Sequence, residues 1–325
     1  MSKLIWHALA FLLLPVAGVQ AGSGKNVLLI CNKSDDTVSF VDTRTFAVLG
    51  TAATGGGPHE IAVAPGGEWA FVANYEAEES SISLIDVRAM KEVRRIPIRP
   101  YRNPHGIAVS ADGKRLYATC EGSEAVIEMD IASEKVTRSI ETGQRVSHML
   151  VLTPDERKMY VANIGSGTVT VIELDKSKVT AQIGTGDGCE GIDVTPDGRQ
   201  VWASNRGAGS VSVIDTRTDK VIANLPCKGF PIRVKIAGDG GLAFVSCASA
   251  NEIAVFDIRT RKEVRRIKAG RAPIGILLED GGGRAFVANT RANTVSVIDL
   301  ETFEVVRKIE AGNTPDGLGI ASKQH

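Results

Sequence analysis

Three histidines and two carboxylates occupy the same position of a sequence phrase that recurs along the chain. In chain order, this position reads His59, His105, His148, Glu190, Ile232, Ile274 and Asp316. Imidazole and carboxylate groups gathered at one rim suit zinc, copper or iron better than calcium. The row therefore predicts a divalent transition metal (Zn, Cu or Fe) on His59, His105, His148 and Glu190, with Asp316 as a weaker candidate.

The same histidines also have a purely structural interpretation, in which the imidazoles bond to carbonyl groups of the rim and to water. Duplication of a repeat copies its residues, so His59 and His105 are not independent signs of a site. The chain contains no HExxH, P-loop, GxSxG or haem-attachment CxxCH motif. It contains no CxxC pair either, so the usual sequence signatures of zinc are absent.

Four further side chains are expected on the same face as the histidine row. Arg206 and Arg291 follow second strands of their repeats, Arg271 precedes a first strand, and Tyr75 begins the one lengthened loop of the array. Guanidinium groups bind carboxylates and phosphates through paired hydrogen bonds. These four residues are therefore candidates for binding an anionic small molecule, and scattered solvated arginines are the alternative.

These side chains must be positioned by a repeat of about 40 residues. An acidic residue ends the third strand of each copy, 42 to 44 residues after the previous one: Asp42, Asp86, Asp130, Glu173, Asp215, Asp257 and Asp299. Each copy contains four short apolar runs separated by turn residues. Such a period is typical of a β-propeller in which every repeat forms one four-stranded blade. The sequence therefore predicts an all-β, seven-bladed β-propeller.

The two ends of the repeat array predict how the ring closes. The array begins with a second-strand sequence at residues 27–31 and ends with a first-strand sequence at residues 317–321. We expect the C-terminal strand to complete the N-terminal blade, because this closure removes exposed sheet edges. Residues 22–325 then form a single propeller domain.

Several repeat segments resemble the YVTN family of β-propeller proteins. They are YVAN at 160–163, FVAN at 286–289, and VSVID at both 211–215 and 295–299. The resemblance extends from about residue 27 to the end and implies a propeller fold. Its wider relatives include lactonases, lyases and proteins of quinone- or haem-dependent oxidation. Seven-bladed propellers of other families carry iron or copper on inner-strand histidines and look similar in this one respect. The resemblance implies no particular mechanism, because one fold supports many functions.

Residues 1–21 are predicted to be a signal peptide. Lys3 precedes the apolar run 9–14, and VQA at 19–21 resembles a signal-peptidase site, so cleavage after Ala21 is expected. No other apolar run approaches the roughly 18 residues of a membrane span. We therefore expect a periplasmic or otherwise exported monomer without a membrane span; an uncleaved anchor is the alternative.

The charge balance narrows the expected partners. The 38 basic and 38 acidic residues cancel, which argues against nucleic acid as a partner. A small molecule or another periplasmic protein is expected instead. The predicted function is a binding or accessory module that works at the histidine rim. A metal-dependent enzyme of the lactonase, lyase or oxidoreductase kind is one alternative, and a structural cell-surface repeat protein is another.

Five cysteines in an exported chain leave at least one thiol unpaired. Cys31 falls within a strand and is expected to be buried and free. The other four map to the histidine face or its loops. A bridge between Cys189 and Cys227 is the first expectation, and a bridge between Cys227 and Cys247 is the second.

Overall fold

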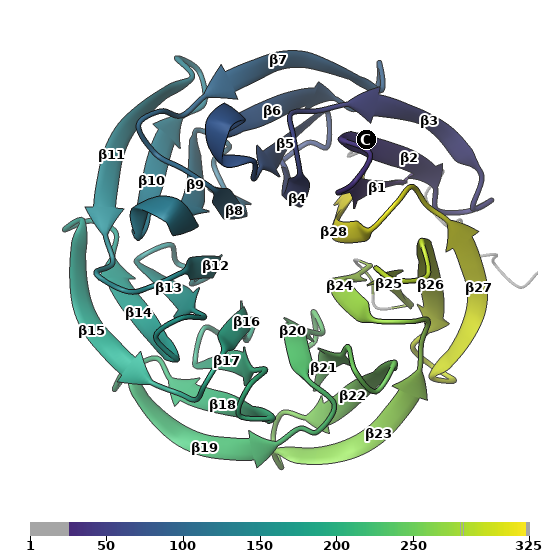
Figure 1. Ribbon diagram of the computed structural model, residues 1–325. Coiled ribbons are helices and arrows are strands. Elements are labelled where there is room, and N and C mark those ends of the chain that lie inside the picture. Colours follow the sequence, from purple (N-terminus) through teal and green to yellow (C-terminus); the bar gives the residue numbers. More distant parts are fainter. Residues whose placement is uncertain (1–25, 280, 282, 323–325) are drawn as a thin grey trace, which may run out of the picture.

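Seven antiparallel sheets of four strands stand around a central axis like the blades of a propeller (Figure 1). This computed structural model describes residues 26–279, 281 and 283–322. In six of the sheets the strands follow one another in chain order, and in the seventh the last strand of the chain joins the first three. The prediction of an all-β, seven-bladed propeller is confirmed. The predicted signal peptide lies outside the described residues.

The strands of the first three blades have the following bounds. The first blade contains β28 (Pro315–Ala321), β1 (Val27–Asn32), β2 (Thr37–Asp42) and β3 (Val48–Ala53). The second contains β4 (Pro58–Val63), β5 (Trp69–Asn74), β6 (Ser81–Asp86) and β7 (Lys91–Pro97), with the 3-10 helix η1 (Ala77–Glu79) after β5. The third contains β8 (Pro104–Val109), β9 (Arg115–Cys120), β10 (Ala125–Asp130) and β11 (Lys135–Glu141), with η2 (Glu121–Ser123) after β9.

The remaining four blades contain strands only. The fourth consists of β12 (Ser147–Leu152), β13 (Lys158–Asn163), β14 (Thr168–Glu173) and β15 (Lys178–Gly184). The fifth consists of β16 (Cys189–Val194), β17 (Gln200–Asn205), β18 (Ser210–Asp215) and β19 (Lys220–Pro226). The sixth consists of β20 (Pro231–Ile236), β21 (Leu242–Cys247), β22 (Glu252–Asp257) and β23 (Lys262–Lys268). The seventh consists of β24 (Pro273–Leu278), β25 (Arg284–Asn289), β26 (Thr294–Asp299) and β27 (Glu304–Glu310).

The burial pattern of each strand follows its place in the blade. In the fifth blade, the second strand β17 and the third strand β18 carry unbroken buried runs, because both of their faces pack against neighbouring blades. The outer strand β19 alternates exposed and half-buried residues, since one of its faces meets solvent. No helix among the described residues is long and apolar enough to span a membrane.

The acidic residue that marks each repeat stabilises the turn between the third and fourth strands. Asp215 Oδ1 accepts hydrogen bonds from the backbone N of Thr218 at 2.8 Å and from its hydroxyl at 2.9 Å. Aspartate commonly forms such local bonds to its own turn. The glutamate that replaces it, Glu173, pairs instead with Lys176 at 2.5 Å. The most regular residue of the repeat is therefore a turn residue, on the face opposite the histidine row.

The C-terminal strand closes the ring as predicted. β28 pairs antiparallel with β1, so that Leu28 lies opposite Ile320 and Ile30 lies opposite Leu318. Figure 1 shows β28 beside β1 at the inner edge of the first blade. Leu318 packs into the core shared with the seventh blade, and Ala321 into the core shared with the second. The pairing of β28 with β1 thus completes the first blade, and β28 also packs against the seventh and second blades.

Inner strands of neighbouring blades approach closely where glycine follows the histidine position. A Cβ on Gly191 would lie 2.7 Å from Arg233 Cα and closer still to the Ile232 carbonyl oxygen. Gly106, Gly275 and Gly317 face the next inner strand in the same way. Glycine at these positions lets the inner strands converge around a narrow channel.

Gly191→Ala is expected to destabilise the protein by about 3 kcal/mol, because the new methyl group must push two inner strands apart. Gly184→Ala is the matched control, since a Cβ there meets nothing within 4 Å and its backbone is not left-handed. Urea denaturation followed by circular dichroism measures both. Equal midpoints for the two variants would contradict the close approach of the inner strands.

Candidate functional site

Two rows of side chains meet where the inner strands begin, and we call this end of the channel the mouth. The first row is the second residue of each first strand and includes the predicted histidines. The second row consists of the residues that directly follow the second strands. Four of them have side chains that contact first-row side chains: Lys33, Tyr75, Glu121 and Arg206. In the hairpin register Pro58 lies opposite Asn74 and Pro104 opposite Cys120. Each blade therefore brings one residue of each row to the mouth.

The three predicted histidines lie side by side at the mouth. The ring centroids of His59 and His105 are 4.9 Å apart, and those of His105 and His148 are 3.6 Å apart. His59 also packs against Tyr75, with ring centroids 4.6 Å apart. Three successive blades thus contribute one imidazole each to a continuous aromatic stack.

Two of these histidines form a compact donor group with a carboxylate that the sequence reasoning missed. One ligand atom each from His105, Glu121 and His148 lies within 4.8 Å of the other two. Glu121 follows Cys120 at the end of β9, in the position that Tyr75 and Arg206 occupy in their blades. Reading this second row in register, as the histidine row was read, identifies Glu121 from the sequence.

His148 lies between two carboxylates. Its Nδ1 contacts the carboxylate of Glu121, and its Nε2 is 3.4 Å from Glu190 Oε1. Burial disfavours the charged imidazolium, but the contacts with Glu121 and Glu190 outweigh this and hold the pKa of His148 above its ordinary value. A proton on His148 therefore neutralises part of the negative charge at this side of the mouth.

The pKa of His105 is shifted in the opposite direction from that of His148. Its burial is almost complete, with 2% exposed, and the pKa of His105 is held well below its ordinary value by burial and by the nearby charge of His148. Among the described residues, its Nδ1 has no hydrogen-bond partner. A buried polar atom without a partner is costly, so an atom outside the protein is a natural candidate to satisfy it.

Glu190 is held by two arginines. Arg206 Nη1 is 2.8 Å from its Oε2, and Arg233 Nη1 is 3.6 Å from its Oε1. Burial raises the pKa of this carboxyl, but His148 and the two guanidinium groups lower it by more. The net pKa is below its ordinary value, so Glu190 stays ionised. Its oxygens are thus directed at His148 and the arginines, and it lies outside the compact donor group.

The side chain of Arg233 crosses the channel. Arg233 was not among the site residues predicted from the sequence. It comes from the sixth blade, yet Nη2 reaches Glu60 of the second blade at 2.5 Å, and Nη1 lies 3.5 Å from His148 Nε2 of the fourth. Burial alone would lower the pKa of Arg233, but Glu60, Asp316 and Glu190 raise it. Arg233 and Glu60 follow the first-row positions directly, so they line the channel one residue deeper.

A cavity of 310 Å³ lies on the far side of this ion pair from the mouth. Glu60 and Arg233 line it at one end, and apolar residues of the inner strands, such as Ile107, Met149 and Leu318, line the rest. The Arg233 side chain is 5% exposed. The ion pair thus separates the mouth from the deeper channel.

The remaining first-row candidates are His59, which lies beside His105, and Asp316 of the first blade. Asp316 Oδ2 accepts a bond from Lys33 Nζ at 3.1 Å, and its Oδ1 is 4.0 Å from Arg233 Nη2. Burial raises the pKa of Asp316, but the charges of Lys33 and Arg233 outweigh this effect, and the net pKa is below its ordinary value. His59 Nδ1 is 2.8 Å from the Gly57 carbonyl oxygen, and burial lowers the pKa of His59. Asp316 Oδ2 and His59 Nδ1 are thus partnered within the protein, whereas the buried Asp316 Oδ1 has no hydrogen-bond partner among the described residues.

The four weaker ligand candidates divide into two pairs. Tyr75 donates a hydrogen bond to Glu121 Oε2 at 2.7 Å, and Arg206 pairs with Glu190, so both belong to the mouth. Arg271 and Arg291 are exposed, and the backbone N of Arg291 bonds to the Arg271 carbonyl oxygen at 3.2 Å. Neither of these two arginine side chains contributes to the histidine and carboxylate cluster.

Comparison with known proteins agrees with this architecture. A model of the YNCE-like β-propeller family matches residues 153–284. The matched segment covers less than half of the chain, and the chain is a β-propeller with repeats similar to this family. The resemblance seen in its repeat segments is thereby confirmed, and no curated protein sequence matches the chain.

Three solved structures illustrate the range of similar propellers. Hydrazine synthase of Kuenenia stuttgartiensis is 25% identical, with a TM-score of 0.77 over 84% of this chain and 92% of that one. A functionally unknown protein from Desulfotomaculum acetoxidans is 12% identical, with a TM-score of 0.80 over 92% and 100%. Dihydro-haem d1 dehydrogenase NirN is 18% identical, with a TM-score of 0.65 over 90% and 74%. At 12% and 18% identity, the last two structures indicate a shared fold and nothing about function.

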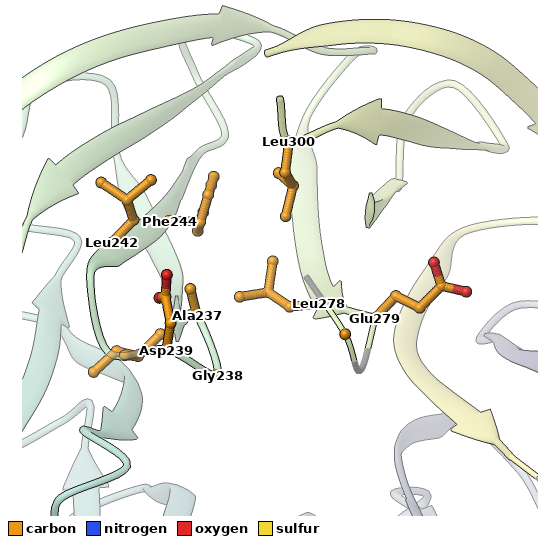
Figure 2. Close-up of a pocket in the computed structure, with 10 residues that line it drawn as sticks. Ala237, Gly238, Asp239, Leu242, Phe244, Leu278, Glu279 and Leu300 are labelled. Carbon is orange, nitrogen blue, oxygen red and sulfur yellow. The ribbon is translucent and has the colours of Figure 1, made fainter. Parts of the chain in front are cut away.

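A further cavity of this propeller lies away from the mouth. It has a volume of 680 Å³ and is lined by residues of the sixth and seventh blades. Figure 2 shows Phe244, Leu278 and Leu300 around it, together with Asp239 and Glu279. Asp239 belongs to the turn between β20 and β21, at the opposite end of these strands from the histidine row. Glu279 is already paired with Arg284 at 2.7 Å, and the described residues that line this cavity offer no comparable group of ligands.

Proposed function

We propose that this protein is an exported binding module that holds a divalent transition metal on His105, Glu121 and His148. The observation that carries the proposal is the compact donor group of two imidazoles and one carboxylate. Two histidines and one glutamate are a known ligand set of zinc, and imidazole also suits copper and iron. Three protein ligands leave a coordination position for a small molecule from outside.

The protonation state of His105 supports this assignment. His105 is neutral and has a ring nitrogen without a partner among the described residues. A neutral imidazole is the form that binds a metal. His148 would have to release its proton for a metal to bind between its ring and Glu121. The positive charge at this point is then restored by the metal.

The surrounding contacts also resemble those of a metal site. Ligating histidines usually donate their second ring N–H to a carboxylate, which fixes the ring and increases its basicity. In this structure His148 directs Nδ1 at Glu121 and Nε2 at Glu190. Tyr75 bonds to the second oxygen of Glu121. We therefore assign Glu190 and Tyr75 to positions that orient the ligands, in place of the sequence-based proposal that Glu190 is a ligand.

Elemental analysis and titration calorimetry test the proposal. Protein purified without a histidine tag, stripped with a chelator and titrated separately with Zn²⁺, Cu²⁺ and Fe²⁺ is expected to bind about one ion per chain. Gel filtration after equilibration separates bound from loosely associated metal. Retention of none of the three ions would overturn the metal proposal.

Glu190→Gln is expected to weaken metal binding by roughly 10- to 100-fold, because it removes the charged partner of His148 and the carboxylate that Arg206 pairs with. The exposed Glu301→Gln makes the same chemical change away from the mouth and serves as the control. Calorimetric titration with the ion that binds wild-type protein measures the affinities. Equal affinities for both variants would contradict the positioning role of Glu190.

A metal-dependent enzyme is the second candidate, and the half-exposed Arg206 beside the open side of the site favours it. Arg206 has 35% of its side chain exposed and can bind an anionic substrate with the guanidinium atoms not used by Glu190. A metal in this position supplies activated water or polarises a carbonyl group. Hydrazine synthase, one of the similar structures, is an enzyme by its name. Hydrolysis of a panel of lactones by metal-loaded protein distinguishes this candidate from simple binding.

The exported location is part of the proposal and is tested separately. N-terminal sequencing of protein recovered from the periplasm of a Gram-negative host is expected to begin at Gly22. Recovery only from the cytoplasm with residues 1–21 intact would contradict export.

A further inference from the structure

Two cysteine side chains face each other between the fifth and sixth blades. Cys227 Sγ and Cys247 Sγ are 3.7 Å apart, and both residues are buried. Cys227 follows β19 in the connection to the sixth blade, and Cys247 ends β21, the second strand of that blade. The two thiols therefore lie on neighbouring segments that are also linked by backbone hydrogen bonds, from Ala248 N to the Phe230 carbonyl oxygen at 3.1 Å and from Ser249 N to the Gly229 carbonyl oxygen at 3.0 Å.

The other three cysteines lie in separate parts of the core. Cys31, Cys120 and Cys189 each pack in a different hydrophobic cluster, and Cys227 and Cys247 share another. Burial raises the pKa of Cys31, Cys120 and Cys189, which keeps these thiols protonated. The expectation that Cys189 pairs with Cys227 is therefore wrong, because the two side chains point into cores on different sides of the fifth blade. Cys31 is buried and free, as expected.

The surroundings of the pair favour reaction of Cys247. A hydrogen bond from Cys227 and the charge of Arg266 lower the pKa of Cys247, whereas the bond to Cys247 and burial raise the pKa of Cys227. Arg266 Nη1 also donates a hydrogen bond to the Lys228 carbonyl oxygen at 3.1 Å. The guanidinium group thus sits beside both ends of the prospective bridge.

The connection between the blades is shaped to pass close over Cys247. Gly229 has a left-handed backbone with φ of 100°, and a Cβ there would lie 3.2 Å from Cys247 Cβ and 2.6 Å from Ala250 Cβ. Only glycine combines this backbone with so close an approach. A disulfide needs its sulfur atoms about 2.0 Å apart, so modest rotations of the two side chains have to bring them together.

We propose that Cys227 and Cys247 are a redox modification site and are joined by a disulfide in an oxidising compartment. The thiolate of Cys247 attacks one sulfur of a low-molecular-weight disulfide such as oxidised glutathione and releases one thiol. Cys227 then loses its proton and attacks the Cys247 sulfur of this mixed disulfide, which releases the second thiol. Two protein thiols are oxidised, and one small disulfide is reduced to two thiols.

The bridge fixes a segment that reaches the mouth. Phe230 belongs to the same connection as Cys227, and the Arg206 guanidinium carbon lies 5.6 Å from the centroid of its ring. Arg206 in turn holds Glu190. The disulfide therefore restrains the aromatic contact that positions one wall of the mouth, and this restraint does not depend on whether a metal binds.

Peptide mapping of unreduced protein tests the proposal on the wild-type chain. Native protein incubated with oxidised glutathione, and protein refolded in a mixture of reduced and oxidised glutathione, are blocked with an alkylating reagent and digested. We expect one intramolecular bridge, Cys227 to Cys247, with the other three cysteines alkylated. The proposal is overturned if both thiols are alkylated in both samples, or if either one is found bridged to Cys31, Cys120 or Cys189.

Thermal denaturation provides the second measurement. Oxidised wild-type protein is expected to melt about 5 °C higher than the reduced protein, because the bridge closes a loop of some 20 residues. Cys227→Ala/Cys247→Ala is expected to melt at one temperature under both conditions. A redox-dependent shift that persists in this double variant would assign the effect to other cysteines and overturn the proposal.

Discussion

Truncation of the chain after Asn313 is expected to lower the melting temperature on the order of 10 °C or to abolish cooperative unfolding. The deletion removes β28, which pairs with β1 and buries Leu318 and Ala321 in cores shared with both neighbouring blades. Burial of each large aliphatic side chain contributes about 2 kcal/mol, and the loss exposes the edge of β1 as well. The effect spreads because each blade is stabilised mainly by its neighbours.

Calorimetry of a matched pair of truncations measures this effect. A chain that stops after Ser322 keeps the whole of β28 and is expected to melt like the full-length protein. If the chain that stops after Asn313 also melts like the full-length protein, closure of the ring by β28 does not stabilise the propeller.

Replacing both His105 and His148 by alanine is expected to abolish stoichiometric metal binding under the metal proposal. The two imidazoles supply two of the three ligands in the compact donor group, and Glu121 alone does not hold a transition metal at micromolar concentrations. His59→Ala is the matched control, because His59 comes from the same row but bonds to the Gly57 carbonyl group. This control is expected to retain one ion per chain.

Elemental analysis after gel filtration measures the metal content of both variants. Circular dichroism verifies the fold, and the double variant His105→Gln/His148→Asn replaces the imidazoles with polar groups if the alanines leave too large a cavity. A folded double variant that still binds one ion with wild-type affinity would refute the assignment of these ligands.

The architecture could be predicted because its determinants are local and repeated. The turn at Asp215 and the strand before it, in which small residues alternate with β-branched ones, are each specified within a few residues. The same local rules apply in every blade. Ring closure was predictable for the same reason, since the first-strand sequence at the C-terminus lacked a blade of its own. The gathering of the three histidines followed directly from their common register.

The internal arrangement of the site was less predictable, because it depends on the directions of side chains from different blades. Glu190 stands in the predicted row, yet its carboxylate turns to Arg206 and Arg233. Arg233 reaches Glu60 from the far side of the ring, a contact between residues 173 positions apart in the chain. The proximity of Cys227 to Cys247 depends similarly on both side chains entering the same core between the fifth and sixth blades. Contacts of this kind are decided by packing across the ring, and no local pattern encodes them.

The ion pair between Arg233 and Glu60 places a charged barrier at the centre of the ring. The guanidinium group is fixed across the axis by carboxylates of two other blades, between the mouth and the cavity of 310 Å³. Whatever binds at the histidines must therefore arrive and depart through the same opening. A protein partner that covers this single opening would control both binding and release, without contacting the ligand itself.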